Sequence, residues 1–323
     1  MKRKTILNIF WIGCVIFGLA SFVICPLPAV AQENAQENTD IDWQKFLAKQ
    51  DPIWEKLPQK FDHGAFLGNG LLGTTIFQDS PQQLRFEIGR SDVTDHRRDN
   101  GRLPIGGMLL KTVGKIQSGT LRTDLWNAEV RGEIITDKGT IKFRAFNHAK
   151  EILLIVDCEF KDDERKAVFQ WEPKNAVVFR DEIKKANITP NPSPEIAEEM
   201  FSGYCKQKRV AGGSYTSAWY IGGVNGKTPL NVERKLLILT VADTFPADES
   251  KREAFETLQQ NAGRTLTTSK LEESHRRWWH NYYQQSFVSV PDSQIEGFYW
   301  NQIYKLASAT RKDRMVIDLL GPW

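Results

Sequence analysis

Cysteine is scarce in this sequence, with four residues among 323. Cys14 and Cys25 lie in the N-terminal apolar stretch, so only Cys158 and Cys205 belong to the rest of the chain. Two cysteines cannot build a disulfide scaffold, so the fold must be held together by its hydrophobic core. Cys158 lies in the apolar run 152–160, where it is either a buried core residue or one half of a pair with Cys205. The sequence leaves both interpretations open.

An excess of one charge sign is also missing once the N-terminal segment is set aside. The chain has 43 basic and 40 acidic residues, and its pI is about 8.5. Residues 1–31 contain three basic residues and no acidic one, which leaves 40 of each sign in the remainder. Such a balanced chain has no basic footprint for nucleic acid or for an anionic membrane surface, so we expect neither partner.

Sequence signatures of metal sites and activated nucleophiles are missing as well. His63, His96 and His148 have no partner at metal-ligand spacing. His275 and His280 are five residues apart, which places them on different sides of a helix. No G-x-S-x-G motif is present. We therefore expect neither a metal nor another cofactor.

The segment at residues 68–73 reads GNGLLG and matches the G-x-G-x-x-G pattern of dinucleotide-binding proteins. That pattern needs a strand before it and a helix after it, because the helix N-terminus holds the pyrophosphate. Residues 62–65 (DHGA) are not strand-like, and residues 74–77 (TTIF) predict a strand rather than a helix. We interpret the segment as a glycine-rich turn into the first core strand.

The first 31 residues have the three parts of a secretory signal peptide. Basic residues at positions 2–4 precede an apolar stretch at 6–24, and residues 29–31 (AVA) form a cleavage site. An uncleaved membrane anchor is the alternative, because the apolar stretch is long for a signal peptide. We expect cleavage, and hence a secreted or periplasmic protein that no membrane segment anchors. Residues 32–40 (QENAQENTD) predict a disordered leader.

From about residue 41 to residue 245, apolar and polar residues alternate with the period of half-buried strands. Two such runs, at 128–134 and 141–146, flank Asp137-Lys138-Gly139 and predict a β-hairpin. A long loop is expected at residues 181–204. Many short strands with turn signals indicate an antiparallel sandwich. The other expected strands are at residues 73–78, 84–88, 107–111, 151–160, 167–171, 176–180, 217–221 and 235–241.

After about residue 246 the pattern takes the period of helices, and residues 248–261 predict a polar helix. Capping boxes at 269–272 and 293–296 predict two more helices, so we expect two domains in series. The second helix should be buried along Leu271, Trp278, Trp279 and Tyr282. The third should be buried along Ile295, Tyr299, Ile303 and Leu306.

These two helices carry too many aromatic residues to be stable as an isolated pair. They must pack either on the β part of the chain or against further helices. We favour the second interpretation, in which the chain is a truncated piece of a larger protein.

Residues 89–102 form the densest polar segment of the sequence, with Asp92, Asp95, His96 and Arg97 between two expected strands. Acids, amides and guanidinium groups supply both the donors and the acceptors that sugar hydroxyls require. An ordinary solvated loop whose charges neutralise one another has the same composition. Some tryptophans are also able to stack on sugar rings, although most tryptophans of a sandwich are core residues. The candidates are Trp126, Trp171, Trp219 and Trp323.

These features together resemble the α-L-fucosidase-type glycoside hydrolases (family 95) and related six-hairpin glycosidases. Residues 67–73 (LGNGLLG) are similar to the glycine-rich first strand of those enzymes. Residues 86–97 (FEIGRSDVTDHR) occupy the place of a polar segment that reaches toward the substrate. Trp278-Trp279, Pro291-Asp292, the helix at 294–308 and Gly321-Pro322-Trp323 resemble their linker helices and first barrel helix. The resemblance covers most of residues 54–323.

The resemblance implies a mainly β fold with an antiparallel β-supersandwich at residues 41–265. Residues 266–323 would form linker helices and the first helix of an incomplete α/α toroid. In such enzymes the catalytic carboxylates lie inside the toroid, so the sequence assigns no catalytic residue here. The implied reaction is inverting hydrolysis of an oligo- or polysaccharide by one acid and one base, and this chain alone should be inactive.

The resemblance also implies that Asp92, Asp95, His96, Arg97 and Trp323 border the sugar. The polar segment departs from the fucosidase pattern, in which an Asn-Glu followed by a Trp is usual, so fucose is not assumed. A secreted β-sandwich that binds glycans without cleaving them is the alternative function. The sequence makes no prediction about the oligomeric state.

Overall fold

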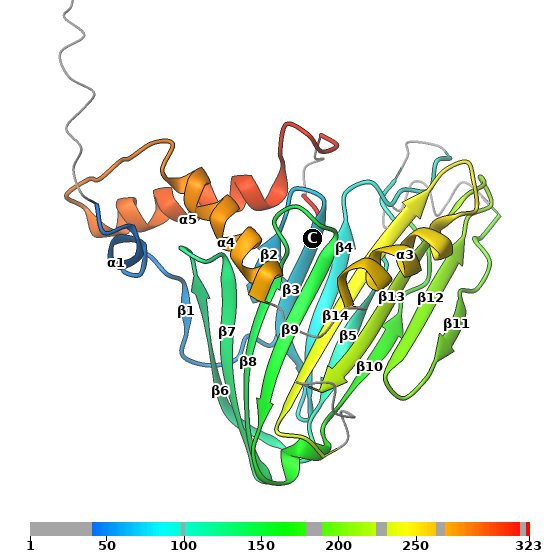
Figure 1. Cartoon of the computed structure of the whole chain (residues 1–323), viewed down its shortest axis with the longest axis horizontal. Helices are drawn as coiled ribbons and strands as arrows, with labels where there is room; N and C mark the ends of the chain where they lie inside the picture. The colour runs from blue at the N-terminus through cyan, green and yellow to red at the C-terminus, as the bar shows by residue number, and fades with distance from the viewer. Residues whose placement is uncertain (1–40, 98–100, 179–188, 224–230, 263–268, 317–320) are drawn as a thin grey trace, which may run out of the picture. The chain divides into compact units, whose positions relative to one another are not determined.

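The computed structural model describes residues 41–97, 101–178, 189–223, 231–262, 269–316 and 321–323. Two antiparallel β-sheets make up most of these residues, and the larger helices follow them in the chain (Figure 1). The fold is therefore mainly β, with helices toward the C-terminal end, as the sequence predicts. The expected signal peptide and leader lie outside the described residues.

Within the described residues the larger sheet has nine strands in the order β1-β6-β7-β8-β9-β14-β13-β12-β11, and all neighbours are antiparallel. The predicted hairpin is confirmed, because β7 and β8 pair with Thr136 opposite Gly139. The strands are β1 (Ile53–Trp54), β6 (Ile116–Asp124), β7 (Glu129–Thr136), β8 (Gly139–Asn147), β9 (Leu153–Phe160), β11 (Glu195–Glu198), β12 (Ser202–Lys208), β13 (Ser214–Gly223) and β14 (Arg234–Thr244).

The smaller sheet has five strands in the described part of the chain, in the order β10-β5-β4-β3-β2. Two short 3₁₀ helices, η1 (Phe61–His63) and η3 (Asp162–Lys166), precede β2 and β10. The strands are β2 (Ala65–Gly68), β3 (Leu72–Ser80), β4 (Gln83–Arg90), β5 (Gly106–Lys111) and β10 (Val168–Pro173).

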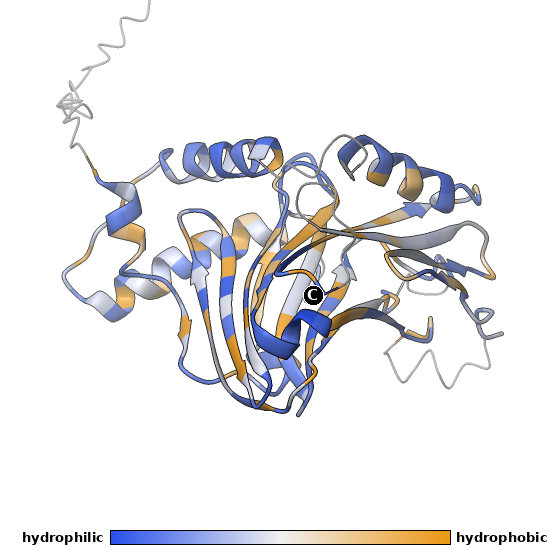
Figure 2. Cartoon of the chain, turned by 60° about the horizontal axis from the view of Figure 1, so that its bottom comes forward, coloured by the Kyte–Doolittle hydropathy of each residue, from blue (hydrophilic) through white to orange (hydrophobic). Residues whose placement is uncertain are grey.

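The main hydrophobic core lies between the two sheets. Phe86 of the smaller sheet and Phe143 of the larger sheet are both buried, and their ring centroids are 5.7 Å apart. The alternation of core and solvent residues is visible as bands of orange and blue along the strands in Figure 2. Period two therefore identified strands such as β8, in which the buried Ile141 and Phe143 alternate with the more exposed Lys142 and Arg144.

Two predictions about strands are wrong. Residues 176–178 form no strand, and the remainder of the expected strand at 176–180 lies outside the described residues. The expected loop at 181–204 contains β11 and the start of β12 instead. All four residues of β11 are exposed, so this edge strand has no apolar face that a periodicity argument could detect.

The two cysteines do not pair. Cys158 in β9 and Cys205 in β12 are both buried free thiols. The strands follow one another in the order β9-β14-β13-β12, so three spacings of about 4.8 Å separate the two residues across the sheet. A disulfide needs Cα atoms within about 7 Å, which excludes the bond and leaves the core interpretation.

Helix α3 (Ser250–Ala262) confirms the helix predicted at residues 248–261. It covers part of the outer face of the larger sheet (Figure 1). Its buried residues Ala254 and Leu258 belong to one cluster with Phe146, Leu153 and Ile238 of the strands. This second layer explains why these strands are apolar on both faces.

Helices α1 (Trp43–Leu47), α4 (Ser269–Tyr283) and α5 (Ser293–Ala309) share another cluster with loops of the sandwich. Leu125, Ala128 and Ala149 supply the sandwich side of this cluster, and the rings fill it from the helices. The helices therefore pack on the β part of the chain, and the favoured expectation that these rings need further helices to bury them is wrong. The buried rings of α4 and α5 are Trp279, Tyr283, Trp300 and Tyr304.

The predicted apolar stripe of α5 is wrong. Ile295 and Leu306 are 60% and 54% exposed, whereas Trp300, Tyr304 and Ser308 are buried. Both sets of positions follow helical spacing, so α5 is apolar on two faces and periodicity cannot choose between them. On α4 the prediction was correct for Trp279, but the other members of the predicted stripe are only partly buried.

A buried carboxylate ties α4 to the larger sheet. Glu129 of β7 is fully buried and accepts hydrogen bonds at 2.8 Å from Arg131 and from Arg276 of α4. The alternating pattern places Glu129 on the solvent side of β7, and α4 covers that position. Burial raises the pKa of Glu129, and Arg144, Arg276 and Arg131 counteract the rise.

No helix among the described residues combines the length and the apolar character needed to cross a membrane.

Candidate functional site

The glycine-rich turn at residues 68–73 uses its polar groups internally. The Asn69 side chain is buried; its oxygen accepts from the backbone N–H groups of Leu71 (3.1 Å) and Leu72 (2.8 Å). Its amide nitrogen donates to the carbonyls of His148 (3.1 Å) and Glu151 (3.0 Å). A strand follows the turn, so no helix N-terminus is present to bind phosphate, and the interpretation as a turn is confirmed.

The glycines of this turn allow the C-terminal part of the chain to come close. A Cβ atom on Gly68 would collide with Ser308 at the end of α5, and one on Gly73 would lie 2.8 Å from the carbonyl oxygen of Pro322. Gly89 at the end of β4 lies against the same proline. The backbone N–H of Gly70 donates to the Ser308 carbonyl at 2.8 Å. Gly68 and Gly73 of the motif therefore lie where two stretches of backbone touch and leave no room for a side chain.

Trp323, a predicted sugar-binding residue, lies at this edge of the smaller sheet. Its indole N–H donates to the Leu67 carbonyl at 2.9 Å, and its ring meets that of Phe66 edge to face at 4.8 Å. The Arg102 guanidinium donates to the carbonyl oxygens of Gly321 and Trp323. Arg102 is the last residue of the polar segment and forms a β-bridge with Thr94 of the same segment, so it ties the C-terminal residues to that segment.

The predicted residues of the polar segment lie together, and their acids are already paired. Asp92 accepts two hydrogen bonds of 2.7 Å from Arg90. Asp95 accepts from Arg97 at 3.0 Å and from the Asn191 amide at 3.1 Å. Burial alone would raise the pKa of Asp95, but the hydrogen bonds from Arg97 and Asn191 outweigh it and lower the pKa.

A fully buried ion pair lies beneath this segment. The Arg209 side chain is 0% exposed and donates to Asp243 at 2.5 Å and 2.6 Å and to the Thr94 carbonyl at 3.3 Å. Burial raises the pKa of Asp243 to about 6 although Arg209 lowers it, and the nearby Asp92 raises it further. The cluster fixes the polar segment to the ends of β13 and β14.

His96 has a left-handed backbone (φ 59°), and its ring stacks on Phe245 with centroids 3.9 Å apart. Burial and the positive charge of Arg209 lower the pKa of His96, which favours its neutral form. Phe245, Asn191 and Arg209 could not be identified from the sequence, because their contacts with the segment join residues far apart in the chain. The arrangement suits a rigid binding wall better than proton transfer, since its acids are held by guanidinium groups.

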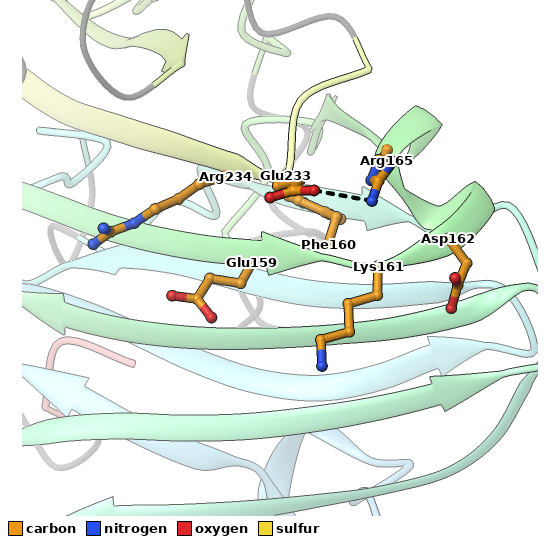
Figure 3. A pocket seen from close by; sticks show the side chains of 7 residues that line it. All are labelled: Glu159, Phe160, Lys161, Asp162, Arg165, Glu233 and Arg234. Carbon is orange, nitrogen blue, oxygen red and sulfur yellow. Dashed lines mark hydrogen bonds and ion pairs between the residues drawn. The ribbon is translucent and has the colours of Figure 1, made fainter.

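Other polar surface is found on the uncovered part of the larger sheet. Two depressions, each of about 490 Å³, share Glu159 and Arg234. Figure 3 shows the first, with the Arg165–Glu233 ion pair (2.9 Å) on one side of it. Acids and bases alternate across both depressions. Among the described residues, no group of His, Cys, Asp or Glu side chains gathers as a metal site requires.

No protein-family model and no curated protein matches this sequence. Among solved structures, a protein provisionally described as a kojibiose phosphorylase from the human microbiome is similar, with a TM-score of 0.50 and 12% identity over 76% of this chain. A bacterial glucoamylase complexed with acarbose (TM-score 0.41, 11% identity) is matched over 80% of this chain, and the GH92 family glycosyl hydrolase ccman5 (0.31, 10%) over 78%. This chain spans 36%, 44% and 38% of the lengths of these proteins. At 12% identity the first likeness bears on the fold alone.

Proposed function

We propose that this chain is the N-terminal part of an exported glycoside hydrolase that acts on oligo- or polysaccharides. The observation that carries this proposal is the second apolar face of α5. Ile295, Phe298 and Leu306 are 60%, 68% and 54% exposed, while the opposite face of the helix is buried. Large apolar side chains that remain exposed together on one face of a helix mark a surface that another element covers. A further helical layer, forming the α/α toroid, would cover these side chains.

In this proposal the catalytic acid and base belong to the toroid, and the reaction inverts the anomeric centre. Such enzymes hold two carboxyl groups about 6.5–9.5 Å apart, which leaves room for the attacking water. The polar segment and Trp323 would border the substrate from the sandwich side. Because the charges of the polar segment are paired within the protein, the segment would form a rigid surface that positions a sugar. The resemblance to family 95 supports the class of enzyme, and the sugar itself is not assigned.

The first test is hydrolysis by residues 32–323. We expect no turnover of aryl α- or β-glycosides by this chain, because it lacks the proposed acid and base. Measurable turnover would overturn the proposal. The second test is a chain extended by the codons that follow residue 323. We expect amphipathic helices, glycosidase activity and protection of the α5 residues from surface labelling; an extension without helices would contradict us.

A non-catalytic glycan-binding sandwich is the second candidate. It is favoured by the burial of Trp279, Tyr283, Trp300 and Tyr304 against the sandwich, since the helices already have a partner there. Residues 32–265 without the helices discriminate between the two. Glycan binding by that shorter chain would favour the second candidate, and loss of glycan binding would count against it. A lower melting temperature is expected for both candidates, because the shorter chain loses the buried rings.

A further inference from the structure

Phe245, directly after β14, carries an exposed aromatic ring at the polar segment. The residue is 47% exposed, although the ion pair of Arg209 and Asp243 beneath the segment is buried. The His96 imidazole covers one face of the Phe245 ring, with an interplanar angle of 12°. Because that face is covered, the exposed area belongs to the other face and to the edge of the ring. Phe245 therefore presents a flat apolar surface to solvent.

The turn between β12 and β13 approaches this ring through a glycine. A Cβ atom on Gly212 would lie 3.9 Å from the Cε2 atom of Phe245. Gly212 has a φ of 104°, which favours glycine, so the turn brings no side chain against the ring at this point. In the same turn the backbone N–H of Val210 donates to Oδ1 of Asn191 at 2.9 Å, and the Asn191 amide donates to Asp95. The turn and the polar segment are therefore tied together around the exposed ring.

The support under the ring is fixed in the absence of a ligand. His96 has a φ of 59°, which few residues other than glycine adopt. Such strained residues persist only where their surroundings hold them, and they cluster at ligand sites. The next residue toward the N-terminus, Asp95, is held by Arg97 and by the Asn191 amide. A ligand would therefore not have to order the ring or the imidazole behind it.

We propose that Phe245 is a glycan-binding residue whose exposed ring stacks on the C–H face of one pyranose unit beside the polar segment. The inference rests on the proposed function, which supplies the glycan, and it deepens that function by naming a residue that contacts the sugar. The side chains of Asp95 and Asn191 already bond within the protein, so the ring supplies most of the attraction at this place. His96 then has the role of a positioning residue, because it lies behind the ring that contacts the sugar.

The experiment titrates residues 32–323 with maltohexaose, cellohexaose and xylohexaose and follows binding by saturation-transfer NMR. For one stacked unit we expect a Kd on the order of 1 mM for at least one of them. Phe245→Leu should weaken that binding about tenfold, because it removes the flat ring and keeps an apolar side chain on His96. Phe245→Tyr keeps the ring and should retain the binding. The matched control is Phe255→Leu on α3, which changes a phenylalanine of similar exposure (44%) and should leave binding unchanged.

A second measurement keeps the test decisive if Phe245→Leu fails to fold. In a deuterated chain in which only the phenylalanines are protonated, irradiation of their ring protons should transfer saturation to the C–H protons of the sugar. Phe245→Tyr should abolish this transfer while the sugar still binds, and Phe255→Tyr should retain it. Equal transfer in the two variants would overturn the inference, and so would the absence of binding by all three oligosaccharides.

The hydrolase proposal fails by a different result. An extended chain that lacks glycosidase activity but still binds sugar through Phe245 would refute only the hydrolase proposal. In an active extended chain, Phe245→Leu should raise the KM for a polysaccharide relative to Phe255→Leu. Equal KM values for these two variants of an active enzyme would refute only the role of Phe245.

Discussion

The polar segment and the helices α4 and α5 are attached to the sandwich by different kinds of interaction. The polar segment is fixed by buried charges, with Arg209 on Asp243 and Arg90 on Asp92. Helices α4 and α5 are fixed mainly by aromatic rings, together with two buried histidines, His148 and His275. The comparison shows that the same sheet pair anchors one element by electrostatics and another by packing. The two buried histidines of one attachment and Asp243 of the other should therefore change stability with pH in opposite directions.

The largest expected effect is a loss of stability in acid, through the two buried histidines of the helical attachment. Burial lowers the pKa of His148 to about 4 and that of His275 to about 3, so both stay neutral in the folded protein while the unfolded chain takes up protons below its ordinary value of 6.5. Their stabilising contribution is full above pH 6.5 and is lost as the pH falls. At about 1.4 kcal/mol per unit and group, the loss approaches about 7 kcal/mol at pH 4.

Urea unfolding between pH 7 and pH 4 measures this loss. The His275→Gln variant should lose about half of the pH slope, because one of the two groups is removed. The exposed His63→Gln should keep the slope of the original chain. Equal slopes for all three proteins would show that the buried histidines do not govern acid sensitivity.

Removing a ring from the helical attachment should have the next largest effect. Trp279 is fully buried in the cluster of α1, α4 and α5. The Trp279→Ala change should lower the free energy of unfolding by about 4 kcal/mol, because it leaves a large cavity. Phe298→Ala on the exposed face of α5 is the control and should change it by less than about 0.5 kcal/mol. Similar effects of the two changes would mean that the assignment of the buried faces is incorrect.

Within the charged attachment, Asp243 should show the opposite pH dependence. The pKa of Asp243 is raised to about 6, above its ordinary value of 3.8, so the folded state holds the proton more tightly. Its contribution is most favourable below pH 4 and is lost as the pH rises to 6, by about 3 kcal/mol. In Asp243→Asn this opposing contribution is absent, so the acid loss between pH 6 and pH 4 should become steeper. A flatter profile in that variant would contradict the prediction.

The smallest effect is expected on the outward face of α5. Replacing Ile295 by Lys and Leu306 by Glu should change the free energy of unfolding of this chain by less than about 0.5 kcal/mol per site. In an extended protein with a helical layer on that face, the same changes should cost several times more, because charges would be buried. Chemical denaturation of both chains gives the comparison. Equal, small costs in both would remove the support for a covering layer.

Local sequence patterns predicted the parts of the fold that depend on near neighbours. The hairpin of β7 and β8 was found from alternation and a turn. Helix α5 was found from a capping signal, although its N-cap is Asp292, which accepts from Gln294 and Ile295, and not Ser293 of the predicted box. The buried face of α5 was missed because two apolar stripes compete on it. The stripe that is buried packs against loops more than a hundred residues earlier in the chain. Periodicity carries no information about contacts between such distant segments.

The candidate site was predictable only as a collection of residue types. Asp92, Asp95, His96 and Arg97 were chosen because polar residues crowd one segment, and their role at a binding site stays a prediction. Their pairing with Arg90, Asn191 and Arg209 was not visible, since side-chain partners are set by the tertiary fold. Glu129 shows the same limit. The strand pattern predicts that its side chain is exposed to solvent, whereas α4 packs over it and buries it.

The contact between the glycine-rich turn and the C-terminal residues has a consequence for folding order. Trp323 and Leu67 are 256 positions apart, and Arg102 and Gly321 are 219 apart. During synthesis, the first strands of the smaller sheet must wait for these distant residues before their edge is closed. Contacts of such long range slow folding and leave the edge open to incorrect association. We therefore expect the closure of this edge, which the glycines make possible, to be a slow step of folding.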